Sequence, residues 1–158
     1  MANVSTELVW EEIEKNIFAV LGMVSSKHEA RTAGVMSVAR QGKLYITSDK
    51  NAWKTRHIAA NPHVSLTVAI PKSVPLMPWI KVPAATITFA GEATLVAPDS
   101  IDADLRQRLY GPVAADAAKI AGSTVIVVEP AGEFVSYGVG ASLIEMRATV
   151  KARGRAPA

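Results

Sequence analysis

The stretch that decides the fold is GKLYITSDKNAWKTRHIAANPHVSLTVAI, residues 42–70. Its alternating apolar residues predict a strand over residues 44–47, and a polar turn follows over residues 48–51. A short basic helix comes next, and a second strand is expected over residues 64–70. A strand that leads hydroxyl groups and a lysine into the start of a helix is suited to phosphate, because unpaired N–H groups and the positive end of the helix dipole point there.

Four side chains around this turn can contact a phosphate: Arg31, Thr47, Ser48 and Lys54. Hydroxyl groups donate to phosphate oxygens, and lysine and arginine neutralise them. In the alternative interpretation Ser48 is only a helix cap, and Lys54 and Arg56 are only solvated charges. Trp53 either covers an aromatic ligand or packs in the core, and its residue type favours the core.

Composition indicates one globular domain over residues 1–147, because 49% of the 158 residues are hydrophobic and 20% are charged. The chain has no cysteine, which excludes disulfides, a thiol nucleophile and the usual structural zinc sites. An acidic start unlike a signal peptide, together with the lack of cysteine, favours the cytoplasm. No apolar run reaches the roughly 20 residues that a membrane helix needs, so no membrane association is expected.

The net charge of +3 comes entirely from the C-terminal tail, residues 148–158. Residues 1–147 contain 14 Lys or Arg and 14 Asp or Glu, so this part is neutral. A nucleic-acid-binding protein usually carries its basic face on the folded domain. We therefore expect the tail, with Lys151, Arg153 and Arg155, to be a frayed, solubilising end rather than a nucleic-acid contact.

The remaining pattern predicts a mainly β (α+β) protein. Further strands are expected within 18–26, 31–39, 86–96, 124–128 and 134–146, and helices over 5–16, 99–110 and 113–121. Gln41-Gly42 indicates a hairpin, Gly91 suggests a bulge or a close approach of two backbones, and the proline-rich stretch 71–83 is expected to be a loop. Strands in neighbouring pairs favour an antiparallel sheet, and closure into a small barrel of about six strands, with short peripheral helices, removes exposed edges.

No motif for acid–base, nucleophilic or metal chemistry is present. The chain has no P-loop, no GxSxG and no GxGxxG. Three histidines lack the spacing of metal ligands: His28, His57 and His63. Asp99, Asp102 and Asp104 lie at the start of a predicted helix, where acidic residues are favoured in any case. An enzymatic function would therefore depend on a cofactor.

Residues 13–96 resemble the pyridoxamine 5′-phosphate oxidase-like, FMN-binding split-barrel superfamily, including its small general-stress-protein-like members. The matching segments, in order, are Arg31–Met36, Ile46-Thr47-Ser48, Lys54, the run Ala59–Val68 with its Asn61-Pro62, and Phe89–Ala93. The resemblance implies a split β-barrel that forms a homodimer and binds a flavin in a groove between the subunits.

The resemblance also implies ten cofactor-binding residues: Arg31, Gly34, Val35, Met36, Ile46, Thr47, Ser48, Trp53, Lys54 and Thr86. Arg31 and Lys54 would bind the FMN phosphate, with help from the two hydroxyl groups. The backbone of residues 34–36 would follow the isoalloxazine ring, Ile46 would pack near the ribityl chain or the ring, and Thr86 would reach the cofactor from the next strand.

Three residues depart from the family pattern. Ala52 stands where a serine usually precedes the lysine, and Trp53 occupies a position that is often basic. Asp49 adds a negative charge beside the phosphate, which is unfavourable unless it points away. Residues 134–158 have no match to the substrate-phosphate contacts of the true oxidases, so pyridoxamine phosphate is not the expected substrate.

The expected function is an FMN-binding oxidoreductase that moves a hydride between FMN and a reduced nicotinamide or small organic substrate. One alternative is a flavin- or haem-binding sensor or stress protein with little turnover. Another is a deazaflavin-dependent reductase, in which Lys50, Arg56 and Lys72 would bind the longer phosphate-bearing tail of that coenzyme. Loop 71–83 either lines the substrate side or forms a plain loop or dimer contact.

Overall fold

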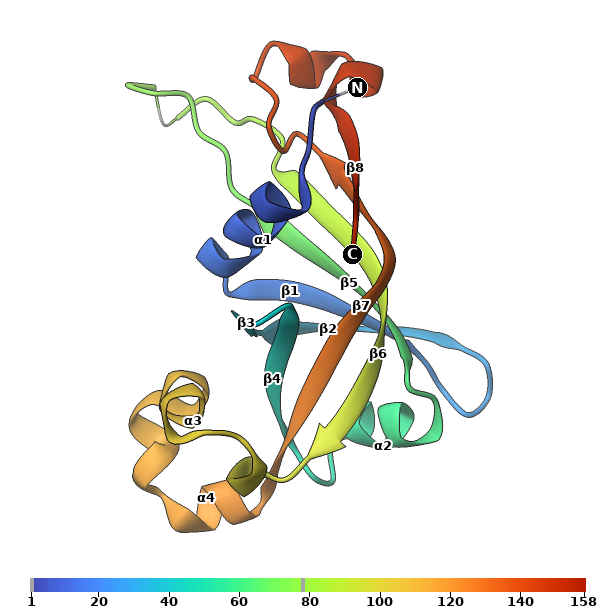
Figure 1. Ribbon diagram of the computed structural model, residues 1–158, viewed down its shortest axis with the longest axis vertical. Helices are drawn as coiled ribbons and strands as arrows, with labels where there is room; N and C mark the ends of the chain where they lie inside the picture. Colours follow the sequence, from blue (N-terminus) through green and yellow to red (C-terminus); the bar gives the residue numbers. More distant parts are fainter. Residues whose placement is uncertain (1, 78) are drawn as a thin grey trace.

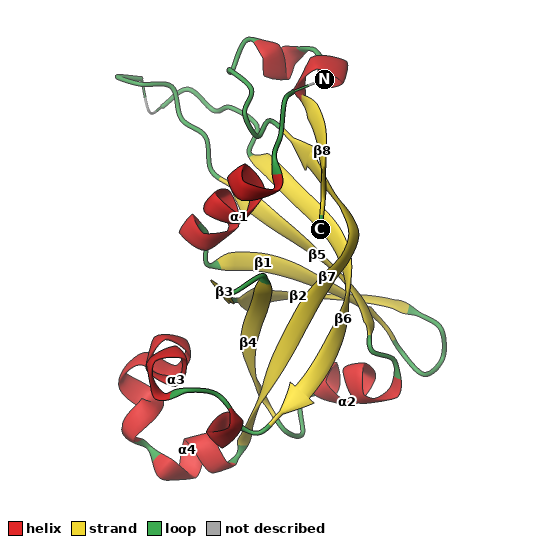
Figure 2. Cartoon of the chain, in the orientation of Figure 1, coloured by secondary structure: helices red, strands yellow, loops and turns green. Residues whose placement is uncertain are grey.

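A computed structural model describes residues 2–77 and 79–158. Within these residues one curled antiparallel sheet of eight strands dominates the molecule (Figures 1 and 2). The strands are β1 (Phe18–Val24), β2 (Ala30–Met36), β3 (Val38–Arg40), β4 (Lys43–Asp49), β5 (His63–Ile70), β6 (Ala85–Val96), β7 (Ser123–Tyr137) and β8 (Arg153–Pro157). Their order is β2-β1-β5-β6-β7-β4-β3, and β8 pairs with β7. This curled sheet is the predicted split barrel.

The two edges of the sheet meet at a single residue. β2 lies at one edge and β3 at the other, yet only Ser37 separates them in the chain. Ser37 is buried, and its N–H donates to the carbonyl oxygen of Ile17 at 2.7 Å. Because one residue spans the two edges, they lie together at this point, and no ladder pairs β2 with β3 among the described residues. This unpaired seam is the split of the barrel.

The longest strand, β7, connects the two ends of the molecule. One of its edges pairs with β6. Its other edge pairs first with β4, over residues 123–128, and then with β8, over residues 133–137. Pro130, which has no N–H group to donate, lies in the gap between these two partners, where its loss of a ladder bond is tolerated.

Helices occupy the gaps between strands. They are α1 (Thr6–Lys15), α2 (Trp53–Ala60), α3 (Ala103–Tyr110), α4 (Ala117–Ala121) and α5 (Thr149–Ala152), with short 3₁₀ turns at Pro98–Ser100, Gly111–Ala115 and Glu145–Arg147. Side chains of Ser5, Asp102 and Asp116 cap α1, α3 and α4. Figure 1 shows α3 and α4 at one end of the sheet, and loop 71–83 with the 139–152 segment at the other.

The core lies inside the curled sheet and is closed by α1. Val9 and Ile13, one helical turn apart on α1, are buried there, whereas Ile17 follows the end of the helix and is exposed. Phe134 contacts Phe89 and Trp10 edge-to-face, with ring centroids 5.2 and 5.6 Å apart. These aromatic contacts join the sheet to α1.

Several sequence-based predictions are confirmed. Gln41 and Gly42 both have positive φ, as the predicted hairpin requires. Gly91 marks a close approach, because a Cβ there would lie 2.6 Å from the carbonyl oxygen of Glu129. The register shift on β6 lies elsewhere, between Thr88 and Ala90. Loop 71–83 contains neither helix nor strand among its described residues.

Three predictions are wrong. The segment 31–39 is not one strand, because Ser37 divides it between opposite edges of the sheet. The segments 124–128 and 134–146 are not separate strands, because β7 continues through Pro130 to Tyr137. The tail is not frayed over residues 149–157, because α5 and β8 order it and bury Ala152 and Ala156.

The described helices include none that is long and apolar enough to cross a membrane.

Candidate functional site

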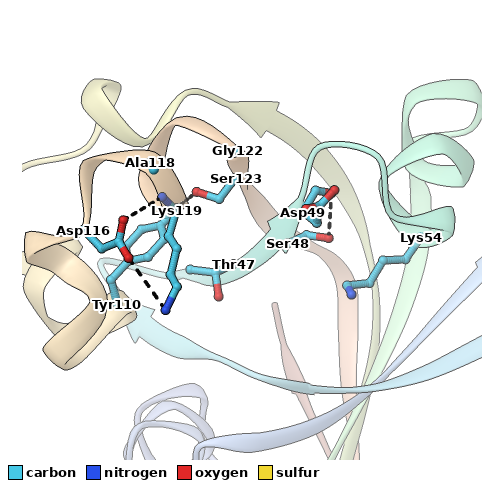
Figure 3. A pocket seen from close by; sticks show the side chains of 10 residues that line it. All are labelled: Thr47, Ser48, Asp49, Lys54, Tyr110, Asp116, Ala118, Lys119, Gly122 and Ser123. Carbon is cyan, nitrogen blue, oxygen red and sulfur yellow. Dashed lines mark hydrogen bonds and ion pairs between the residues drawn. The ribbon is translucent and has the colours of Figure 1, made fainter.

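A cavity of about 720 Å³ lies where β4 ends and α2 begins. We call it the lysine cavity, and its lining residues are Thr47, Ser48, Asp49, Lys54, Tyr110, Asp116, Ala118, Lys119, Gly122 and Ser123. Figure 3 shows that two segments far apart in the sequence form its walls, the β4–α2 turn and the end of the 98–122 helical segment. The cavity therefore contains three of the four predicted phosphate-binding side chains.

Two cations and one hydroxyl group lie on the same side of the turn. In Figure 3 the amino groups of Lys54 and Lys119 and the hydroxyl of Thr47 point in the same direction. Lys119 lies 3.7 Å from the carboxylate of Asp116, whereas no ion pair within the described residues includes Lys54. Lys54 is thus available to an anionic ligand, and Lys119 is a second cation that sequence reasoning missed.

Ser48 acts as a structural hydroxyl group. It is buried, and its Oγ lies 2.8 Å from Oγ1 of Thr55, which in turn donates to the carbonyl oxygen of Asp49 at 2.7 Å. Because a carbonyl oxygen only accepts, Thr55 donates to Asp49, and Ser48 donates to Thr55. The hydroxyl hydrogen of Ser48 is therefore used to fasten α2 to β4, which leaves Thr47 as the hydroxyl group available at this turn.

The start of α2 has no side-chain cap. Ala52, at the capping position, offers no acceptor, and no acidic residue lies in the first turn. The carboxylate of Asp49 accepts from the N–H of Asn51 at 2.6 Å and so is held in the turn itself. The first N–H groups of this eight-residue helix retain their capacity to donate to an anion. Replacement of the usual serine by Ala52 thus leaves the helix start open.

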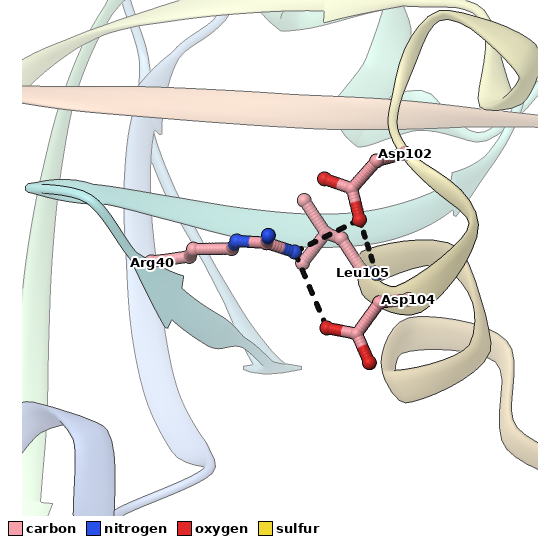
Figure 4. Close-up of polar contacts among 4 residues, drawn as sticks. All are labelled: Arg40, Asp102, Asp104 and Leu105. Atoms are coloured by element: carbon pink, nitrogen blue, oxygen red, sulfur yellow. Dashed lines mark hydrogen bonds and ion pairs between the residues drawn. The ribbon is translucent and has the colours of Figure 1, made fainter.

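Polar contacts hold the helical segment 98–122 beside the cavity. Arg40, at the end of β3, donates to Asp102 at 2.9 Å and to Asp104 at 3.3 Å (Figure 4). The Asp102 carboxylate also accepts from the N–H of Leu105 at 3.0 Å, and this bond, aided by Arg40, lowers the pKa of Asp102. The hydroxyl groups of Tyr110 and Ser123 lie 2.6 Å apart. These contacts fix the segment that carries Lys119.

Arg31 and Trp53 line a neighbouring cavity of about 410 Å³ with Thr32 and His57. Arg31 forms an ion pair with Glu29 at 2.6 Å, and both side chains are about half exposed. Trp53 is 41% exposed and contacts His57 edge-to-face, so its predicted place in the core is wrong. The predicted pair of phosphate cations, Arg31 and Lys54, is therefore divided between two cavities.

The other predicted residues lie in three different places. Gly34, Val35 and Met36 belong to the edge strand β2, whose outer backbone groups have no neighbouring strand among residues 2–77 and 79–158. Ile46 is in the core and only 1% exposed, so its side chain has no contact surface to offer a ribityl chain or ring. Thr86 lines a separate cavity, with Arg153 and Arg155, on the part of the sheet where β8 pairs with β7.

The residues that sequence reasoning missed come from the helical segment. Asp116 and Lys119 do show a helix-start pattern, and Ser123 opens the next strand. Their position became evident only from the pairing of β7 with β4, which sets Asp49 opposite Ser123. That pairing joins residues more than 70 positions apart, and no local pattern encodes it.

The curled antiparallel sheet with its open split defines the split-barrel class of fold. A lysine at a helix start lies beside this sheet. The family model for pyridoxamine 5′-phosphate oxidase matches residues 5–136. The chain therefore belongs to the pyridoxamine 5′-phosphate oxidase family. No curated protein matches the chain.

The solved structures that share this fold have names that refer to different ligands and activities. The chain is similar to an F420 reductase, with 22% identity, a TM-score of 0.57, and coverage of 78% of this chain and 93% of that one. It is similar to HutZ, the haem storage protein of Vibrio cholerae, with 15% identity, a TM-score of 0.64, and coverage of 85% and 96%. It is also similar to an FAD-binding protein of Mesorhizobium loti, with 15% identity, a TM-score of 0.60, and coverage of 80% and 88%. At these identities the likeness concerns the fold.

Proposed function

We propose that this protein binds a flavin, with FMN as the favoured form, through its phosphate in the lysine cavity. The observation that carries the proposal is that Lys54, Thr47 and Lys119 line one cavity at an uncapped helix start, with their polar ends pointing the same way. Lys54 would neutralise the phosphate, and Lys119 would add a second cation in competition with Asp116. The Thr47 hydroxyl would donate to a phosphate oxygen, and the free N–H groups of α2 would add further donors. The donor set fits a phosphate without a metal ion.

The edge strand β2 is the proposed neighbour of the flavin ring. Its outer N–H and C=O groups lack a partner strand, and a flat ring with donors and acceptors on one edge can pair with such a row. Gly34 lets the ring of Phe18 pack closely against β2, because a Cβ at this position would lie 3.1 Å from that ring. The chain would thus hold the ring by backbone contacts and the phosphate by side chains.

The proposed activity is oxidoreduction of a small organic substrate or a reduced nicotinamide. A bound flavin supplies the hydride acceptor and donor, which the protein's own side chains lack. The part of the chain at the lysine cavity orients the cofactor and neutralises its charge, and β2 fixes the ring plane. The cytoplasm is the proposed location.

A homodimer is proposed on the strength of an apolar surface next to β2. Phe18 and Met36 are directly opposite each other on β1 and β2, and they are 49% and 67% exposed. Ile17, beside Phe18, is also exposed. An apolar cluster at the sheet edge that borders the ring site can be buried by a second copy, which would also cover the flavin.

The experiment is a fluorescence titration of the purified protein with FMN, with a deazaflavin coenzyme and with haemin in parallel. We expect saturable binding of FMN, and a loss of about tenfold or more in affinity for Lys54→Gln, because charge-assisted hydrogen bonds contribute about 1.5–3 kcal/mol. Lys50→Gln is the matched control, since the Lys50 amine donates to the carbonyl oxygen of Ala121. Equal FMN affinity in Lys54→Gln and wild type would refute the site.

The second candidate is a deazaflavin coenzyme, and one observation favours it. Lys119 provides a cation beyond Lys54, which a longer phosphate-bearing tail could use. Of the tail-binding residues predicted from sequence, Lys72 belongs to loop 71–83 at the opposite end of the sheet, so it does not serve the same cavity. Tighter binding of the deazaflavin than of FMN, with a larger loss of affinity for the deazaflavin than for FMN in Lys119→Gln, would select this candidate.

A further inference from the structure

A second cavity, of about 550 Å³, lies at the end of the sheet away from the lysine cavity. We call it the apolar cavity. Its walls are loop 71–83 and the segment before β8, and its lining residues are Val74, Ile80, Lys81, Val82, Pro83, Leu143, Ile144, Met146 and Arg147. Seven of these nine side chains are apolar, and the volume is in the range of small-molecule sites, about 300–1,000 Å³.

The wall formed by the C-terminal segment is firmly held. Met146 is buried, and its carbonyl oxygen accepts from the hydroxyl of Tyr137 at 2.7 Å. Gly138 lets Met146 pack closely, since a Cβ there would lie 2.6 Å from the end of that side chain. The Glu145 carboxylate accepts from the N–H and the hydroxyl of Ser142 at 2.8 and 2.7 Å. The concave surface is therefore a built feature of this segment.

The two polar side chains of the lining are both cations. No ion pair within the described residues includes Lys81 or Arg147. The neighbouring acid is Glu145, whose carboxylate accepts two hydrogen bonds from Ser142. These bonds lower the pKa of the Glu145 carboxyl group, which is charged at neutral pH. Lys151 also lowers the pKa of Glu145 through its positive charge. The apolar cavity is thus lined by two cations that form no ion pair within the described residues.

We propose that the apolar cavity binds a small amphipathic anion, an aliphatic chain that ends in a carboxylate, sulfate or phosphate. The seven apolar side chains bury the chain, and Lys81 and Arg147 pair with the head group. The lining contains no aromatic ring, which favours a flexible aliphatic body over a stacked planar one. Ile144 of the lining is 81% exposed, so the apolar surface continues to the opening of the cavity.

The test compares decanoate with decanol, both below the concentration at which they form micelles, by isothermal titration calorimetry without flavin. We expect decanoate to bind at least tenfold more tightly than decanol. The double variant Lys81→Gln/Arg147→Gln should remove this difference while retaining the weak binding of decanol. Lys72→Gln/Lys151→Gln is the matched control, because it removes two nearby cations that do not line the cavity, and it should keep the preference.

Filling the cavity provides the second arm. Val82→Trp should abolish binding of both ligands, with folding verified by its circular-dichroism melting curve. If that variant does not fold, Ile80→Asp, at a position that is 41% exposed, replaces it. Unchanged decanoate binding in a folded filled variant, or equal affinity of wild type for decanoate and decanol, would overturn the proposal.

A third experiment distinguishes binding of a single ligand molecule from binding to a lipid surface. Co-sedimentation with vesicles of phosphatidylcholine, with and without phosphatidylglycerol, is measured for the same variants. Binding to the anionic vesicles without binding of monomeric decanoate would overturn a site for single molecules. Because no step uses FMN, the outcome is independent of the lysine cavity.

Discussion

The two ends of this barrel hold their cavities in different ways. At the lysine cavity, the helical segment 98–122 is attached by helix caps, by the hydroxyl pair of Tyr110 and Ser123, and by Arg40 on two carboxylates. At the apolar cavity, the wall continues into the core through Met146 and the buried residues of β8. The polar end can present hydroxyl groups and lysines to a phosphate, whereas the apolar end offers surface to an aliphatic chain.

The difference also concerns how charges are used. Around the lysine cavity the cations Lys119 and Arg40 already have acidic neighbours, so a ligand has to compete with them. At the apolar cavity Lys81 and Arg147 form no ion pair among the described residues, so a ligand would provide their first direct ionic partner. At the lysine cavity Lys119 and Arg40 are therefore engaged and Lys54 is open, whereas both cations of the apolar cavity are open.

The largest expected effect is on the free energy of unfolding, and it concerns the core at the end of the sheet that carries the apolar cavity. Phe134→Ala removes a ring with no exposed surface and its contacts with Phe89 and Trp10, and should lower the free energy of unfolding by about 3–5 kcal/mol. Urea unfolding followed by circular dichroism measures this value. Val135→Ala, on the exposed face of the same strand, is the control and should cost far less. Equal losses for the two variants would contradict the proposed role of the core at this end.

The next prediction compares Lys119 with Arg31, the two candidates for a phosphate-binding cation beside Lys54. Lys119→Gln should weaken FMN binding by about tenfold, the equivalent of one charge-assisted bond. Arg31→Gln should weaken it less, because Glu29 already pairs with Arg31 and the side chain lines a different cavity. Fluorescence titration gives both affinities. A greater loss in Arg31→Gln than in Lys119→Gln would restore the assignment suggested by the family pattern.

Removal of one hydroxyl group should have a smaller effect at the polar end. Tyr110→Phe deletes the bond to Ser123 without changing the ring, and should cost about 1 kcal/mol of stability. The midpoint of thermal unfolding and the FMN affinity should both fall slightly, because this bond holds the wall that carries Lys119. Tyr45→Phe is the comparison, since Tyr45 lies outside the lysine cavity. A larger change in Tyr45→Phe would show that the Tyr110 bond does not hold this wall.

The smallest effect is a change in acid sensitivity. The pKa of Asp102 is lowered below its usual 3.8 by the N–H of Leu105 and by Arg40. A carboxyl group with a lowered folded-state pKa stabilises the protein above its unfolded-state pKa, and this contribution is lost as pH falls through the folded-state value. Asp102→Asn keeps a capping oxygen but cannot titrate. The fall in melting temperature from pH 7 to pH 3 should therefore be smaller in Asp102→Asn than in wild type, and an equal fall would contradict the prediction.

Local patterns were sufficient for most of the sheet. The alternation of Val64, Leu66 and Val68 predicted a strand with one buried face, and Gln41-Gly42 predicted the hairpin between β3 and β4, where both positions have positive φ. They failed where a residue had a role set by distant partners. Ser37 divides a continuous strand pattern between two sheet edges, and Pro130 is accommodated only because β7 changes partners there.

The candidate site, like the sheet, was predictable only where local patterns define it. Thr47 and Lys54 follow from a strand, a turn and a helix start, which are all local. Lys119 does not, because its place beside them depends on the antiparallel pairing of β4 with β7. Ser48 resembled a ligand-binding hydroxyl group, yet its hydrogen is used by Thr55, a partner seven residues away. The sequence identified the turn, but it could not show which of its hydroxyl groups forms a structural hydrogen bond and which is available to a ligand.

The single-residue connection at Ser37 ties the two edges of the sheet together. β2 and β3 are also joined through the continuous order β2-β1-β5-β6-β7-β4-β3, so their separation depends on the curl of the whole sheet as well as on this short link. A proline at position 37 would remove the N–H group that donates to the carbonyl oxygen of Ile17, and it would fix one backbone angle of the link. The substitution should therefore disturb both edges of the sheet at once.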